Sequence, residues 1–141
     1  MIKHIWSVLC GSSSIDNESN KVSLFNILEN LTIYGDPEQV TGIPINVEIL
    51  TLWERLYEEP CEGFMRIILI NPHEIASQPF EFNIDLKEAH FHRTRMAITG
   101  LPLSGPGRYV YQVAYKEGET NWQIAAELPI LIRFENSENN P

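Results

Sequence analysis

Two histidines separated by one residue, His90 and His92, are the side chains in this 141-residue chain whose spacing could place them at a metal ion. Side chains at positions i and i+2 of a β-strand point to the same side. Strand-borne metal sites that begin with such a pair add a Glu a few residues later and a further His. Here Arg93, Thr94 and Arg95 follow, no His comes later, and the arginines would repel a cation. We predict no metal, and we keep His90 and His92 as candidate ligand-binding residues.

Two aromatic residues could form a platform for sugar rings. Trp53 falls at the end of an expected strand and Tyr57 in the loop that follows it. Trp6 and Trp122 lie in phase with apolar neighbours, and we expect both in the core. Trp53 and Tyr57 are therefore the second pair of candidate ligand-binding residues, and they would make the chain a carbohydrate-binding module.

Motifs for catalysis are absent from the sequence. No Gly-x-Ser-x-Gly turn and no glycine-rich phosphate loop occurs, and Cys10 and Cys61 do not form a Cys-x-x-Cys pair. The three aspartates lie in different segments, which disfavours a calcium site. We predict no catalytic residues, no cofactor and no enzymatic activity. The alternative is a metal-dependent enzyme at His90 and His92.

The elements that must position these residues are strands. From Trp122 to Phe134 every even position is apolar, and most odd positions are polar or small. A period of two is the pattern of a strand with one buried face, so Ile124 and Ile130 should both be buried. Pro129 cannot donate to a sheet and should mark an edge, a bulge or a crossing between sheets.

About eight such segments predict an all-β fold, a two-sheet antiparallel β-sandwich of immunoglobulin-like type, with a closed barrel as second choice. Residues 11–20 and 100–107 are expected loops. Residues 21–33 read as a bulged strand, although Leu24, Ile27, Leu28 and Leu31 also fit a helix with Ser23 as N-cap. Residues 1–135 form one domain, and residues 136–141 read as a disordered tail. The expected strands are residues 2–10, 21–33, 43–52, 64–70, 80–86, 90–99, 108–116 and 122–134.

Charge limits the partners. The formal net charge of -9 disfavours nucleic acid and anionic membranes, which attract cationic surfaces. No apolar stretch is long enough to span a bilayer, and the N-terminal apolar run is too short for a secretory core. We expect a cytoplasmic protein whose Cys10 and Cys61 are free thiols.

Two segments resemble a bacterial family of small β-sandwich, immunoglobulin-like domains of unknown function. Residues 8–10, a polar loop and residues 21–28 are similar to the family's opening hairpin, and residues 105–113 (GPGRYVYQV) are similar to its closing hairpin. The resemblance covers about half the chain, and Gly11 stands where the family would have an acidic residue. It implies the fold and a bacterial cytosolic setting, and it implies no activity.

Two segments carry more apolar side chains than one inner sheet face needs. A sandwich's outer face is normally polar, so a loop of the chain or another chain should cover the surplus. We therefore predict a non-enzymatic binding module that acts through protein–protein contacts, with an unknown partner or as a homodimer. The residues concerned are Leu50, Leu52, Phe64, Met65, Ile67, Ile68, Leu69 and Ile70.

Overall fold

The computed structural model describes residues 1–136, which form nine strands and no helix. No helix of this part of the chain could therefore cross a membrane. Of the predicted tail 136–141, only Asn136 belongs to the described residues. The strands are β1 (Ile2–Ile15), β2 (Val22–Ile27), β3 (Asn30–Tyr34), β4 (Gly42–Arg55), β5 (Cys61–Ile70), β6 (Phe80–Leu86), β7 (Phe91–Pro102), β8 (Gly107–Lys116) and β9 (Gln123–Glu135).

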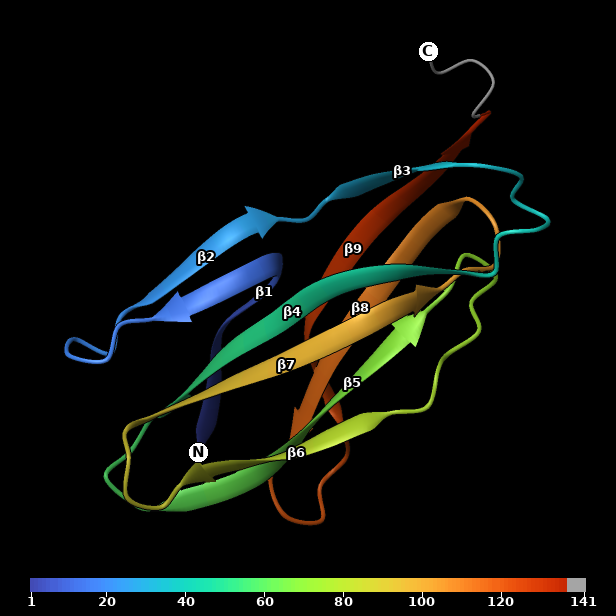
Figure 1. Ribbon diagram of the computed structural model, residues 1–141. Helices are drawn as coiled ribbons and strands as arrows, with labels where there is room; N and C mark the ends of the chain where they lie inside the picture. Colours follow the sequence, from blue (N-terminus) through green and yellow to red (C-terminus); the bar gives the residue numbers. More distant parts are fainter. Residues whose placement is uncertain (137–141) are drawn as a thin grey trace.

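The strands form two sheets, which confirms the predicted two-sheet β-sandwich. The four-stranded sheet has the order β2-β1-β4-β7, and the five-stranded sheet has the order β3-β9-β8-β5-β6. Figure 1 shows β4 and β7 crossing in front of β8 and β5. All neighbouring strands are antiparallel except β3 and β9, which are parallel. The prediction of a wholly antiparallel sandwich is therefore wrong at this one pair.

Residues 21–33 are neither one bulged strand nor a helix. They form β2 in the four-stranded sheet and β3 in the five-stranded sheet, so the chain changes sheet between them. Asn26 has a positive φ of 56°, and the backbone N–H of Leu28 donates to the carbonyl of Leu9. Because the two halves of this segment belong to different sheets, they bury side chains on opposite sides. The resulting apolar pattern resembles that of a helix.

Two expected loops are partly strand. Ser12 to Ile15 continue β1 and pair with Val22 to Phe25 of β2, so the turn is shorter than predicted. Figure 1 shows β1 bending midway, with its first part beside β4 and its second part beside β2. In the second expected loop, Leu101 and Pro102 continue β7 and Gly107 begins β8. Pro102 is accommodated because β7 is an edge strand, where a missing N–H costs no ladder bond.

A bulge interrupts the alternation of the last strand. Val113 pairs with Ala126, but Ala114 pairs with Ile124, so Ala125 has no direct partner. The bulge reverses the faces upstream of it. Ile130 is 1% exposed as predicted, whereas Ile124 is 60% exposed, and its predicted burial is wrong. Pro129 lies where β9 has a neighbour only on the β8 side, because pairing with β3 begins at Leu131.

Trp53 on β4 lies at the centre of the core. It is completely buried, its indole N–H donates to Thr51 Oγ1 at 2.8 Å, and its ring packs against His4 and Tyr115 at centroid distances of 5.1 and 5.3 Å. Tyr115 belongs to the five-stranded sheet, so the indole joins the two layers. Each sheet contributes one face to this core, as the two-residue period requires.

We expect Trp53→Ala to lower the free energy of unfolding by about 3–5 kcal/mol, because the substitution leaves a large cavity between the two sheets. Urea denaturation followed by far-ultraviolet circular dichroism measures this loss. Tyr57→Ala, which removes an exposed aromatic side chain from the loop after β4, is the control and should change stability by less than about 0.5 kcal/mol. Equal effects of the two substitutions would contradict the central position of Trp53.

Candidate functional site

The two predicted histidines do not converge on a common site. His90 lies in the loop before β7, where its Nε2 is 3.2 Å from Glu54 Oε2 and its ring edge contacts Phe91 at 4.7 Å. His92 lies on β7 opposite Trp53 and is half-buried. Within residues 1–136, no three or more His, Cys, Asp or Glu side chains are grouped so that they could hold a metal ion.

The predicted sugar platform is wrong for Trp53. Its indole faces the core and is completely buried, so no ligand can stack on it. Tyr57 is 61% exposed in the loop between β4 and β5, but Trp53 does not join it at the surface. The prediction failed because the strand continues beyond residue 52, to Arg55, and keeps Trp53 on its inner face.

Trp122 and Trp6, expected in the core, are only half-buried on outer faces. Trp122 precedes β9, and its indole lies between two cations. Arg66 Cζ is 4.6 Å and Lys116 Nζ is 4.8 Å from the ring centroid. Trp6 pairs with Leu52 on the outer face of the four-stranded sheet. The contacts of Trp122 are cation–π interactions, which hold both cations on the outer face of the five-stranded sheet.

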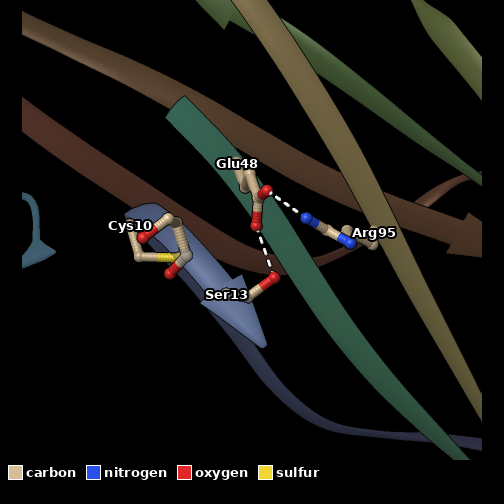
Figure 2. A network of polar contacts seen from close by, with 5 residues as sticks. Cys10, Ser13, Glu48 and Arg95 are labelled. Atoms are coloured by element: carbon tan, nitrogen blue, oxygen red, sulfur yellow. Dashed lines mark hydrogen bonds and ion pairs between the residues drawn. The ribbon is translucent and has the colours of Figure 1, made fainter. Parts of the chain in front are cut away.

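A polar network on the outer face of the four-stranded sheet holds the β1–β2 hairpin (Figure 2). Glu48 of β4 is only 9% exposed, accepts a hydrogen bond from Ser13 and forms an ion pair with Arg95 Nη2 at 2.6 Å. Cys10, beside Glu48 in the sheet, donates from its thiol to the carbonyl of Ser12 at 3.4 Å. Three strands that are distant in sequence, β1, β4 and β7, therefore meet at one carboxylate.

The β1–β2 hairpin covers part of this outer face. Arg93 of β7 donates to the carbonyl oxygen of Asn20 at 3.0 Å, although Asn20 lies in the turn between β1 and β2. Since β7 and β2 are opposite edges of the sheet, the turn must lie across the outer face to reach Arg93. Leu50, which pairs with Val8 and Arg95 on that face, is completely buried. The chain's own hairpin thus accounts for this part of the apolar surplus.

The electrostatics of the network make it structural rather than reactive. The hydrogen bond from Arg95, together with the one from Ser13, lowers the pKa of the Glu48 carboxyl group. Burial, followed by the nearby Glu48 charge, raises the pKa of the Cys10 thiol. Cys10 is therefore a protonated, completely buried thiol at neutral pH, which is the opposite of what a nucleophile needs.

The outer face of the five-stranded sheet carries the other part of the surplus. Along β5, Met65, Ile67 and Leu69 face the core, whereas Phe64, Ile68 and Ile70 face outward. Phe64 is 43% exposed, and Ile68 and Ile70 are half-buried. Because the inner faces of the two sheets pack together, the outer face of the five-stranded sheet lies on the opposite side of the molecule from the β1–β2 hairpin. The predicted apolar surplus on β5 is thus present at the surface.

Four cationic side chains lie on the same face, although the protein has a negative net charge. Arg66, Arg108, Lys116 and Arg133 lie outward on β5, β8 and β9, as their pairing partners show. Among the described residues, none of the four has a carboxylate within 4.0 Å; ion pairs form instead at Lys87 and Arg95. We define the outer patch by eleven outward residues of β5, β6 and β8, of which Val110 and Ala114 are buried by their neighbours. They are Phe64, Arg66, Ile68, Ile70, Glu81, Asn83, Asp85, Val110, Gln112, Ala114 and Lys116.

The two open sides of the sandwich carry cavities. One of about 580 Å³ lies between β1 and β9, where it is lined by Val8, Leu28 and Leu128 and also by Glu29 and Arg108. Another of about 490 Å³ lies between β7 and the start of β6 and has no charged residue in its lining. Neither could be predicted from the sequence, because the lining residues come from strands far apart along the chain.

No protein-family model matches the sequence, and no curated protein matches it significantly. Among solved structures, the chain is similar to the C-terminal domain of wzt, with a TM-score of 0.53 and 10% identity over 93% of this chain and 72% of that chain. It also aligns with a family 123 glycoside hydrolase from Clostridium perfringens, with a TM-score of 0.42 and 11% identity over 96% of this chain and 28% of the enzyme. The first similarity supports the fold alone, and the second is too low to support an argument.

The Glu48 carboxylate should make stability depend on pH. Its pKa is lower in the folded protein than in the unfolded chain, so its stabilising contribution is present above the ordinary pKa of 4.5 and is lost as the pH falls through the folded value. We expect the unfolding free energy of the natural protein to fall more steeply than that of Glu48→Gln between about pH 6 and about pH 3.

Urea titrations at several pH values measure this difference. Glu59→Gln, at an exposed position in the loop after β4, is the matched control for the loss of one negative charge. Parallel pH curves for the natural protein and Glu48→Gln would show that the network does not stabilise the ionised carboxylate.

Proposed function

We propose that the protein is a non-enzymatic interaction module that acts through protein–protein contacts, and that the outer patch binds a second copy of the chain. The observation that supports this proposal is the partly exposed apolar row of Phe64, Ile68 and Ile70 on β5. The other outer face is partly occupied by the β1–β2 hairpin, which leaves the five-stranded sheet as the open face. Burial of apolar surface is the usual driving force for association.

The dimensions of the patch indicate a weak dimer. Three adjacent strands, spaced about 4.8 Å apart and about 30 Å long, cover roughly 450 Å² of each copy. Pairing two such patches buries about 900 Å² in total, which is slightly below the roughly 1,000 Å² of a stable specific interface and falls in the range of weak, transient contacts. We therefore expect association in the micromolar range rather than an obligate dimer.

Charge complementarity favours one arrangement. A two-fold axis parallel to β5 places β6 of one copy over β8 of the other. In the register of the sheet, Lys116 then lies opposite Asn83 of the second copy, with Glu81 and Asp85 on either side. Arg66 lies near the axis, and its guanidinium stacks on Trp122, with Cζ 4.6 Å from the ring centroid.

The alternative, a carbohydrate-binding module, required Trp53 and Tyr57 at the surface, and Trp53 is buried. The proposal keeps the cytoplasmic setting and the relationship to small bacterial sandwich domains that the sequence suggested. In that setting Cys10, which is buried, and Cys61, which is half-buried, stay thiols.

Size-exclusion chromatography with light scattering tests the proposal over about 5–300 µM protein. The mass should rise with concentration from the monomer value of 16.2 kDa toward twice that value. Ile68→Glu should keep the protein monomeric, because it places a charge in the apolar row. Ile27→Glu, at an isoleucine that is 60% exposed on the other sheet, is the matched control and should leave association unchanged.

Charge exchange tests the arrangement. Lys116→Glu should abolish association because it faces two carboxylates, and adding Glu81→Lys and Asp85→Lys to it should restore association. A mass that stays at 16.2 kDa at the highest concentration would contradict self-association. A dimer that tolerates Lys116→Glu would contradict the proposed axis.

A further inference from the structure

The cavity between β7 and the start of β6 lies between the two sheets at one open side of the sandwich. Met96 and Ile98 of β7 form one wall, and Leu69 and Tyr111 of the five-stranded sheet form the opposite wall. Phe80, the first residue of β6, is 57% exposed and stands at the mouth. The volume of about 490 Å³ falls within the range of small-molecule sites.

Two buried tyrosines on β8 differ in how their hydroxyl groups are satisfied. The hydroxyl group of Tyr109 donates to the Gly105 carbonyl at 2.6 Å and accepts from the Ser104 N–H at 2.8 Å. Tyr111 is only 6% exposed, and its hydroxyl group has no hydrogen-bond partner among residues 1–136. The hydroxyl oxygen is not one of the fully buried polar atoms, so a molecule outside the chain can reach it. A water molecule or a ligand in the cavity that Tyr111 lines can take this hydrogen bond.

The other polar groups of the lining do not compete for that role. Ser77 Oγ accepts from the Leu69 N–H at 2.9 Å and donates to the Gln78 carbonyl at 3.1 Å. Gln78 and Thr99 are exposed at the rim. Burial raises the pKa of Tyr111 to about 12, so its hydroxyl group keeps its proton and remains a hydrogen-bond donor at neutral pH.

We propose that this cavity binds a neutral, largely apolar small molecule that carries one hydrogen-bond acceptor, which takes the proton of the Tyr111 hydroxyl group. Its lining contains no Asp, Glu, Lys, Arg or His, so nothing there would compensate a ligand charge. Aliphatic and aromatic side chains on both walls fit an apolar body. The cavity between β1 and β9 differs in having Glu29 and Arg108 in its lining, and its one hydroxyl side chain, Ser7, already forms a hydrogen bond with His4. This inference is independent of the outer patch and goes beyond the proposed function.

Titration with Nile red, a neutral dye with a carbonyl acceptor, tests the proposal. We expect saturable binding with increased fluorescence. In ¹⁵N-labelled protein, the amide signals of Ser77, Gln78 and residues 98–100 should shift. Tyr111→Phe should weaken binding about five- to tenfold, because it removes only the donor. Tyr57→Phe, at an exposed tyrosine, should leave binding unchanged and controls for loss of a hydroxyl group.

Three results would overturn the proposal. These are no saturable binding, unchanged affinity in Tyr111→Phe, and shifts that map to Ser7, Leu9 and Leu128 or to the outer patch. Shift mapping on the natural protein decides the question even if Tyr111→Phe fails to fold. A crystal structure with an ordered water on the Tyr111 hydroxyl group, together with no dye binding, would assign the cavity to solvent alone.

Discussion

The indole of Trp53 spans the space between the two sheets, and the dry contact around it is the interaction on which the rest of the structure depends. Its ring contacts His4 of β1 and Tyr115 of β8, while its N–H is satisfied within its own strand by Thr51. This arrangement fixes which face of each sheet is internal. The surfaces that remain, namely two outer faces and two open sides, are then the places where the molecule can meet other molecules.

The sequence could predict the layers but not the exceptions to the two-residue period. In β6, burial alternates from Glu81 to Leu86, although Phe80 at its start is exposed, and Ile130 and Ile132 of β9 are buried as the pattern requires. The bulge at Ala125 cannot be seen in the apolar pattern of the sequence, because Ile124 continues the alternation although its side chain is exposed. The true end of β4 was equally hidden, and an error of a few residues there turned a core tryptophan into a candidate ligand-binding residue.

Parts of the candidate site could be predicted to different degrees for the same reason. The outward row of Phe64, Ile68 and Ile70 follows from a strand that is apolar on both faces, so the sequence indicated it. The cation pair on Trp122 and the carboxylate network at Glu48 depend on which strands become neighbours, and a single sequence contains no direct record of pairing. Tyr111 could not be distinguished from Tyr109, because both occupy inward positions of one strand.

The parallel pairing of β3 with β9 has a consequence for how the chain acquires its fold. Asn30 pairs with Leu131, so about a hundred further residues must be synthesised before the partner strand of β3 exists. During synthesis, β1 and β2 can form a local hairpin early, whereas β3 stays without a sheet until β9 has left the ribosome. Such long-range closure is slow, because the entropy of a long loop is lost before the contact is gained. Docking of β3 should therefore be among the last events of folding, and truncated chains that lack β9 should leave an apolar segment available to chaperones.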